Sequence, residues 1–269
     1  MMQLDPRASA AGVRLVSHEL LASTNTEALT LVRAGERGPL WVTAGRQSAG
    51  RGRRGRPWTS EPGNLFASLL LTDPAPPEHW SELSFVAALA IHDAIADLAP
   101  SVRPQLAIKW PNDLLLAEAK FAGILTEGEG TETVVVGIGI NCTSHPADTE
   151  YPATDLAAAG VAVSAEAAFS KLSAKMIGRL AQWNRGEHFA TIRTDWLSRA
   201  AGLGDNIRVR LPERELAGLF ETVDEVGRLV LVEPEGTRHA IVAADVVQLG
   251  WPRPQTGQHN EQRDRQREG

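Results

Sequence analysis

The stretch from Gly45 to Trp58 reads GRQSAGRGRRGRPW, with five arginines set among four glycines and no acidic residue. Glycine favours neither helix nor strand, and five cations cannot be desolvated without partners, so a helix or a buried strand is excluded. We therefore expect an exposed loop. Its mobile backbone N–H groups and fork-shaped guanidinium groups suit it to bind phosphates or carboxylates.

Within this loop, residues 50–55 match the letters of the dinucleotide fingerprint G-x-G-x-x-G. That fingerprint leads directly into a helix, whereas Pro57 and the turn residues 60–63 follow here, so we reject a dinucleotide-binding fold. The phosphate-loop pattern G-x-x-x-x-G-K-[ST] is absent as well. A solvated loop without a ligand and an RNA-contacting loop both remain open on this stretch alone.

The composition of the whole chain limits which ligands this loop is expected to bind. The 269 residues carry a formal net charge of -6, and the sequence pI is about 5.7. A basic loop on an acidic chain favours a local anion site over a nucleic-acid surface, which would spread positive charge across a face. The lone Cys142 excludes an intramolecular disulfide, and no apolar run approaches the roughly 20 residues of a membrane span. We therefore expect a cytoplasmic protein that has no signal peptide and binds neither DNA nor a membrane.

The order of apolar patterns predicts a mixed fold. The capping-box spacing of Thr24 and Glu27 predicts a helix over residues 26–34, whereas the residues before Ser17 show no regular pattern. Helical spacing also predicts helices at residues 81–99, 165–183 and 187–198. Apolar or alternating runs predict strands at residues 40–44, 64–71, 106–110, 114–116, 120–127 and 133–142.

The pattern changes at Gly204. Short alternating segments separated by turns follow at residues 207–211, 216–220, 229–232 and 239–242, which predicts a small barrel. After Trp251 the chain is rich in Gln, Arg and Pro with almost no apolar residue, so disorder is expected there. The predicted domains are a first domain at residues 1–203, a barrel at 204–252 and a disordered tail at 253–269.

A second group of polar residues lies at predicted strand ends. Lys109, Asn112 and Asp113 cluster at the end of one strand, and Lys120 begins the returning strand of a hairpin. The Asp113 carboxylate is a hard oxygen ligand suited to a Mg²⁺ ion that carries a nucleotide phosphate. Cations and a metal-binding carboxylate in one cleft can stabilise charge during phosphoryl or nucleotidyl transfer. This group therefore favours an enzyme that uses a nucleotide.

Five separated motifs, taken in order over about residues 17–250, resemble those of the biotin protein ligases. They are STN at 23–25, GRQSAGRGRRG at 45–55, KWPND at 109–113, KFAGIL at 120–125 and GIGIN at 137–141. Each motif is modest alone, and the ordered set is specific. The resemblance implies an α+β catalytic domain, similar to class II aminoacyl-tRNA synthetases and lipoate ligases, followed by a small SH3-like β-barrel.

The resemblance also implies a two-step reaction with ATP and Mg²⁺. The biotin carboxylate attacks the α-phosphate of ATP, pyrophosphate leaves, and the resulting biotinyl-5'-AMP is attacked by a lysine of a biotin carboxyl carrier domain. Cations must screen the two anions that meet in the first step, and the mixed anhydride must be kept from water. We therefore expect the loop at residues 45–58 to be mobile when empty and to close over the ligand.

The short stretch before Ser23 leaves no room for the winged helix of the bifunctional members of the family. A monofunctional ligase rather than a biotin-sensing repressor is therefore expected. The carrier domain of a biotin-dependent carboxylase is its expected protein partner.

Carried over by position, the resemblance implies that Lys120, Arg53 and Asp113 are catalytic and that Asp113 is the metal ligand. The biotin contacts that it implies are Ser23, Thr24, Asn25, Gln47, Gly50, Arg51, Arg53, Trp58, Lys120 and Gly123. The nucleotide contacts that it implies are Arg51, Arg53, Arg54, Arg56, Lys109, Asn112, Lys120 and Asn141. Hydroxyl and amide groups suit the ureido ring of biotin, and Trp58 is expected either to cover the ligand or to pack in the core. Gly137 and Gly139 are expected to mark close approach of a ligand or another backbone.

Two other functions remain as alternatives. A lipoate ligase of the same fold would lack the arginine-glycine loop, and a nucleic-acid-binding module is disfavoured by the acidic chain and the lack of interleaved aromatic residues. A cysteine nucleophile, as in related acyltransferases, is suggested by Cys142 with His145 three residues later. Because a thiol in a strand is usually a small buried apolar group, we expect Cys142 to be inert.

Overall fold

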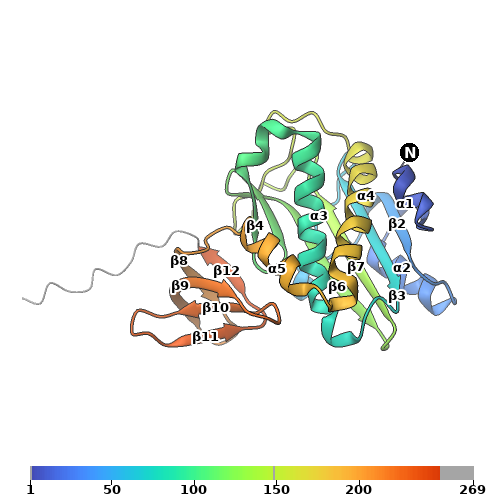
Figure 1. Cartoon of the computed structure of the whole chain (residues 1–269). Helices are drawn as coiled ribbons and strands as arrows, with labels where there is room; N and C mark the ends of the chain where they lie inside the picture. Colours follow the sequence, from blue (N-terminus) through green and yellow to red (C-terminus); the bar gives the residue numbers. More distant parts are fainter. Residues whose placement is uncertain (1, 148, 249–269) are drawn as a thin grey trace, which may run out of the picture.

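A mixed seven-stranded sheet forms the larger domain of the computed structural model, which describes residues 2–147 and 149–248 (Figure 1). The strand order is β1-β2-β3-β7-β6-β5-β4, and the pairing is antiparallel except between β1 and β2. A parallel pair requires a crossover, which helix α2 supplies. The bounds are β1 (Arg14–Leu21), α2 (Thr24–Arg33), β2 (Leu40–Gln47), β3 (Leu65–Thr72), β4 (Leu106–Lys109), β5 (Asp113–Leu116), β6 (Ala119–Glu129) and β7 (Thr133–Ile140).

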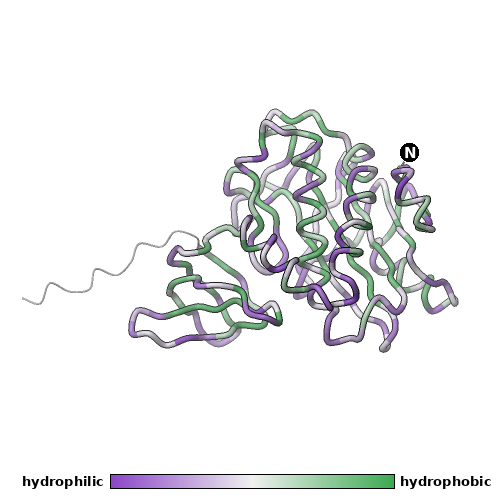
Figure 2. Tube along the Cα trace, in the orientation of Figure 1, coloured by the Kyte–Doolittle hydropathy of each residue, from purple (hydrophilic) through white to green (hydrophobic). Residues whose placement is uncertain are grey.

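Alternation along the central strands gives the sheet two different faces. On β3, Leu65, Ala67 and Leu69 belong to the large core beneath the helices, whereas Leu70 belongs to a small cluster with Ala28 of α2. Because both faces are covered, the central strands read as continuous apolar runs. Figure 1 shows the helices of the large core in front of the sheet, and Figure 2 shows the hydrophobic segments along the strands and α3. These helices are α1 (Pro6–Ala10), α3 (Leu83–Leu98), α4 (Ala165–Trp183) and α5 (Phe189–Leu197).

A charged cluster joins three of these helices. Arg179 of α4 donates to the carboxylates of Asp93 on α3 and Asp195 on α5. Burial alone would raise the pKa of Asp93, but hydrogen bonds with His92 and Arg179 lower it to about 2. A carboxyl with a lowered pKa contributes stability above its ordinary pKa of 3.8 and loses that contribution as the pH falls towards 2.

Replacing Arg179 with Met should lower the free energy of unfolding by about 2 kcal/mol at pH 7, because a partly buried carboxylate pair loses its cation. Urea unfolding measures this loss, and the deficit should shrink as the pH falls from about 4 to 2. Arg185→Met is the matched control, since its ion pair with Asp73 has side chains 53% and 68% exposed and should contribute less than about 1 kcal/mol. Equal losses in the two variants would contradict the role of the buried cluster.

A smaller domain of five antiparallel strands follows, with the order β11-β10-β9-β8-β12. Its interior is apolar and includes Val209, Phe220 and Leu231, so the predicted SH3-like C-terminal domain is confirmed. It contacts the first domain where Trp110 Nε1 donates to the carbonyl of Gly227 at 3.1 Å. Its strands are β8 (Asn206–Arg210), β9 (Glu215–Val223), β10 (Leu229–Val232), β11 (Arg238–Ile241) and β12 (Asp245–Gln248).

Several local predictions were wrong. The residues before Ser17 form α1 and the start of β1, an edge strand whose irregular exposure hides it in the sequence. The fifth strand of the small domain, β12, was also missed because its sequence DVVQ has two adjacent apolar residues and no alternation. Gly45 to Gln47 continue β2, and Arg53–Gly55 forms a short 3-10 turn, so the arginine-rich stretch is not wholly irregular. Its cations are tolerated because this end of β2 runs past the core into solvent.

The predicted capping box was wrong as well. Ser23 is the N-cap of α2 and makes no side-chain capping bond, while Thr24 lies inside the helix. The Thr24 hydroxyl instead reaches Gln47 and Ser68, because tertiary partners on β2 and β3 lie within its range. The disordered tail predicted at residues 253–269 lies outside the described residues. Within those residues, no helix has the length and apolar character needed to cross a membrane.

Candidate active site

A pocket of about 420 Å³ opens on the α2 face of the sheet, within the size range of small-molecule sites. The start of α2, the arginine-rich loop, β6 and β7 surround it, together with Pro146 and residues 149–153, and Asp245 of β12 completes its wall. The predicted site residues that line it are Ser23, Thr24, Asn25, Gln47, Arg51, Arg53, Arg56, Trp58, Asn112, Asp113, Lys120, Gly123 and Asn141. One cleft therefore brings together residues from all five sequence motifs.

Three predicted residues are not part of the lining. Gly50 packs beneath it, where an added Cβ would lie 2.6 Å from Ser60 Oγ. Arg54 pairs with Asp245 at the rim, and the Lys109 ammonium lies 4.6 Å from the ring centroid of Tyr151. These three residues can affect the pocket only indirectly, through the residues that they contact.

One end of the pocket carries uncharged hydrogen-bonding groups. Gln47 Oε1 accepts from the backbone N–H and the hydroxyl of Thr24, and Gln47 Nε2 donates to Ser60 Oγ at 3.0 Å. Ser68 Oγ lies 2.7 Å from Thr24 Oγ1 and was not predicted as a site residue. A hydroxyl fully buried inside the apolar run of β3 was the signal that could have identified Ser68. This end can hold a neutral polar group in a fixed orientation.

The middle of the pocket is shaped by glycines on β6 and β7. Gly123 and Gly139 are register partners, and the Trp58 ring packs on both of them. A Cβ on Gly139 would lie 2.5 Å from that ring, so the glycine is needed to make room for it. A Cβ on Gly137 would lie 2.1 Å from the side chain of Asn25. The groups that approach Gly137 and Gly139 are thus the side chains of Asn25 and Trp58 rather than another backbone. Both glycines line the pocket, and the approach of a ligand to them stays a prediction.

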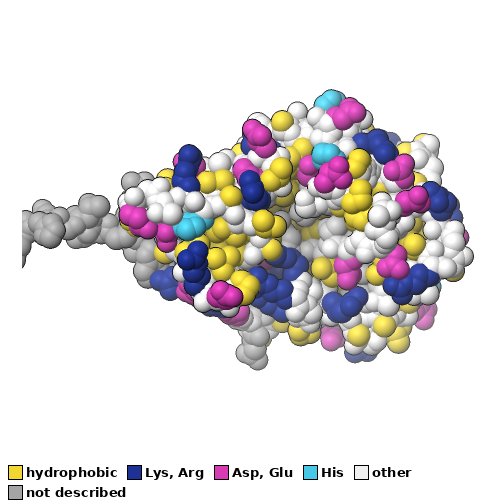
Figure 3. All heavy atoms as spheres, turned by 90° about the horizontal axis from the view of Figure 1, so that it is seen from below, with side chains coloured by type: hydrophobic (Ala, Val, Ile, Leu, Met, Phe, Trp, Pro, Cys, Tyr) yellow, Lys and Arg dark blue, Asp and Glu magenta, His cyan; other side chains and the backbone are white. Residues whose placement is uncertain are grey.

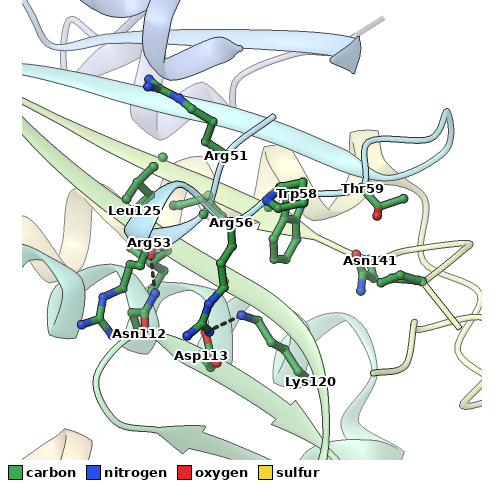
Figure 4. A pocket seen from close by; sticks show the side chains of 18 of the residues that line it. Arg51, Arg53, Arg56, Trp58, Thr59, Asn112, Asp113, Lys120, Leu125 and Asn141 are labelled. Atoms are coloured by element: carbon green, nitrogen blue, oxygen red, sulfur yellow. Dashed lines mark hydrogen bonds and ion pairs between the residues drawn. The ribbon is translucent and has the colours of Figure 1, made fainter. Parts of the chain in front are cut away.

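The other end of the pocket is cationic (Figure 4). Lys120 Nζ lies 2.6 Å from Asp113 Oδ1, and Arg53 Nη1 donates to Asn112 Oδ1 at 3.2 Å. Burial lowers the pKa of the Arg53 guanidinium, with the charge of Asp245 acting in the opposite direction. Burial likewise lowers the pKa of Lys109, and Asp113 opposes this effect. Partly desolvated cations of this kind interact strongly with an entering anion.

The arginine-rich loop is tied to the C-terminal domain. The Asp245 carboxylate accepts from Arg54 Nη1 at 3.0 Å and from Arg56 Nη2, and its hydrogen bond raises the pKa of Arg56. Arg53 Nη1 also donates to the carbonyl of Ala244 at 3.4 Å. Figure 3 shows Lys and Arg side chains gathered at the hollow between the two domains. Asp245 was missed as a site residue because β12 was missed.

Asn141 holds the wall opposite the loop. Its Nδ2 donates to the carbonyl of Thr154 at 3.1 Å, which fixes the segment that carries Tyr151 and Ala153 into the lining. The adjacent Cys142 is 1% exposed, and burial raises the pKa of its thiol to about 12. His145 pairs with Asp155 at 2.6 Å. The expectation that Cys142 is a buried thiol is confirmed, and its inertness stays a prediction.

The described residues include no group of three or more His, Cys, Asp and Glu side chains placed to hold a metal ion. A magnesium ion in a nucleotide site often takes one or two carboxylates and completes its coordination with phosphates and water. Asp113 can supply one such ligand from the pocket wall, although its Oδ1 contacts Lys120. The donor set therefore fits an ion that arrives with a nucleotide rather than a resident metal.

Comparison with known proteins agrees with the geometry of the pocket. Residues 18–142 match the model of the Biotin/lipoate A/B protein ligase family, and residues 202–248 match the biotin protein ligase C terminal domain. A biotin--[acetyl-CoA-carboxylase] ligase of Paracoccus denitrificans is 43% identical over 234 residues, which is 83% of this chain and 96% of the relative. The chain belongs to the biotin protein ligase family.

Other members of the biotin protein ligase family extend the match. A ligase of the same name from Mycobacterium tuberculosis is 32% identical over 84% of this chain and 86% of its own length. The structure of an Aquifex aeolicus biotin protein ligase in complex with biotin and ATP superposes with a TM-score of 0.73 and 25% identity, covering 86% of this chain and 96% of that chain. Both domains of the present structure thus fall within the family fold.

Proposed function

We propose that this protein activates biotin with ATP to biotinyl-5'-AMP and then transfers the biotinyl group to a lysine of a biotin carboxyl carrier domain. The observation that carries the proposal is the two-ended pocket. Neutral groups at Thr24 and Gln47 suit the ureido ring, and the cations Arg53 and Lys120 at the other end suit a carboxylate beside a phosphate. The lone cysteine and the need for ATP support a cytoplasmic location.

In the proposed first step, a carboxylate oxygen of biotin forms a bond to the α-phosphorus of ATP, and the bond to pyrophosphate breaks. Lys120 lies on the pocket wall beside Asp113, where its ammonium can face both reacting anions. Its charge offsets their mutual repulsion and the charge that develops in the transition state. Arg53 adds a guanidinium that neighbouring residues already orient, so little reorganisation is needed.

Asp113 is the residue that we propose to hold Mg²⁺, which would neutralise phosphate charge when it is bound with ATP. The ion pair with Lys120 also keeps the ammonium on the pocket wall. Asn112 lines the pocket next to this pair and would face the phosphates. Lys109, the register partner of Asp113, would add positive charge from behind the pocket wall. Asn141 and the segment around Tyr151 would lie on the nucleotide side of the pocket.

In the proposed second step, the amine of the carrier lysine attacks the carbonyl carbon of the mixed anhydride, and AMP leaves with the bonding electrons. Water must be excluded until the carrier arrives. The arginine-rich loop lies over the cationic end, held by Asp245 and Asn112, and would serve as the cover. Its mobility without ligand remains a prediction.

The proposal is tested by biotin-dependent exchange of labelled pyrophosphate into ATP, followed by transfer of biotin to a purified carrier domain. We expect both activities to require biotin and a divalent cation. Exchange supported by lipoate but not by biotin would assign the protein to the lipoate ligases instead. Absence of exchange with either acid, together with tight RNA binding, would favour the nucleic-acid-binding alternative.

Replacing Cys142 with Ala should leave the pyrophosphate exchange rate within about twofold of the parent, because the buried thiol does not ionise near neutral pH. The removed sulfur leaves a small cavity that should cost about 1 kcal/mol of stability. Thermal unfolding and exchange assays measure the two effects separately. A folded variant with a tenfold slower rate would support the alternative in which Cys142 acts as a nucleophile.

A further inference from the structure

Asn25 is held on several sides at the neutral end of the pocket. It is 4% exposed, and its amide fills the space left by Gly137. Ser68 Oγ donates to its Oδ1 at 2.5 Å, while its Nδ2 donates to the carbonyl of Leu125 at 3.3 Å and to Glu127 Oε2 at 2.7 Å. Both amide hydrogens of Asn25 are thus spent on protein acceptors, so it acts here by fixing the first turn of α2 rather than by donating to a ligand.

The second oxygen of the Glu127 carboxylate faces the arginine-rich loop. Glu127 Oε1 lies 3.6 Å from Arg51 Nη2, and that nitrogen also donates to Thr26 Oγ1 at 3.3 Å. The Glu127 side chain is 29% exposed and does not line the pocket, whereas Asn25 and Arg51 both do. One half-buried carboxylate therefore touches two parts of the site that are far apart in the sequence.

We propose that Glu127 is a positioning residue that couples the neutral end of the pocket to the arginine-rich loop. A charged acceptor makes hydrogen bonds roughly twice as strong as a neutral one, so its bond to Asn25 holds the start of α2 firmly. Its charge also attracts Arg51, which lies in the pocket lining, and so orders this part of the loop before a ligand arrives. The entropy that the loop loses on binding is then smaller, which raises affinity without any new contact to the ligand.

This inference rests on the proposed function, because biotin is the ligand used to test it. Glu127→Gln keeps an oxygen that can accept from Asn25 but removes the charge that faces Arg51. Isothermal titration should show the Kd for biotin rising about tenfold. The kcat for pyrophosphate exchange at saturating biotin should fall less than about threefold, because Glu127 does not face the reacting atoms.

Glu129→Gln is the matched control. Glu129 lies two residues along β6 and pairs with Arg33 at the surface, so the same change of charge on the same strand should leave the Kd for biotin unchanged. An Arg51→Gln variant should weaken biotin binding as Glu127→Gln does. In the double variant the two effects should not multiply, because each removes the same ion pair.

Three results would overturn the coupling, and a fourth would refute the proposed function. Parent-like biotin affinity in Glu127→Gln, or effects that multiply in the double variant, would overturn the coupling. A matching loss of affinity in Glu129→Gln would also overturn it, since general charge on β6 would then be responsible. A parent protein that lacks biotin-dependent exchange would instead refute the proposed function, so the two failures are distinguishable.

Discussion

Replacing Lys120 with Ala is expected to slow biotin-dependent pyrophosphate exchange by about 100-fold to 1,000-fold, while the Kd for biotin rises less than about tenfold. The difference arises because the ammonium acts mainly where two anions approach each other in the transition state. In the structure it lies 2.6 Å from Asp113 and 5.3 Å from the ring centroid of Trp58, at the cationic end of the pocket. Single-turnover kinetics and biotin titration would separate the two quantities.

The variant also leaves Asp113 without its cation, and an unpaired carboxylate would repel the phosphates. Lys120→Arg separates these effects, because it keeps a cation beside Asp113 but moves the charge away from the place of the ammonium. A rate as low as that of Lys120→Ala would assign the loss to the position of the ammonium, and a higher rate would measure the repulsion. Lys175→Ala is the control, since Lys175 pairs with Asp97 on the helical side of the molecule. An unchanged exchange rate in Lys120→Ala would refute the catalytic role of this residue.

Replacing Arg53 with Gly is expected to increase the escape of biotinyl-5'-AMP by about tenfold or more, because its guanidinium ties the arginine-rich loop to other parts of the protein. It donates to Asn112 on one side and to the carbonyl of Ala244 on the other. Loss of these bonds, together with added backbone freedom, should let the loop open before the carrier amine arrives. Biotinylation of bystander proteins and hydrolysis of ATP without transfer both measure the leak.

Arg53→Met separates the loss of the guanidinium from the gain in backbone flexibility, since it removes the guanidinium without adding a glycine. We expect it to leak at a rate between those of the parent and Arg53→Gly. Arg46→Gly is the control, because Arg46 is exposed at the end of β2 and does not line the pocket. A leak in Arg46→Gly equal to that in Arg53→Gly would show that glycine alone loosens the loop.

Much of the fold was predictable because the strongly apolar elements follow simple periods. The central strands and α3 are buried on nearly all sides, so their runs of Leu, Val and Ala stand out in the sequence. β1 was missed because the irregular exposure of this edge strand leaves little pattern, and β12 because its two apolar residues are adjacent and do not alternate with polar ones. The capping-box spacing of Thr24 and Glu27 was misleading as well, because the Thr24 hydroxyl bonds to side chains of β2 and β3 and does not cap its helix.

The candidate site was predictable where motif residues themselves face the pocket, as Gln47 and Lys120 do. The supporting residues were not, because their roles depend on strand register. Ser68 is recognisable only as a lone hydroxyl in an apolar strand, and Glu127 only once β6 is known to direct it towards Asn25. Asp245 lies nearly 200 residues along the chain from the arginines that it pairs with, so no local sequence pattern could predict these ion pairs.

The packing of Trp58 on Gly123 and Gly139 gives the pocket an intrinsic optical probe. Among the tryptophans that the structure describes, Trp58 alone lines the pocket. The others, such as Trp41 and Trp183, are shielded in the protein interior. Emission from Trp58 should therefore respond to any molecule that displaces it or its lysine neighbour, so ligand entry can be followed in real time without attaching a dye.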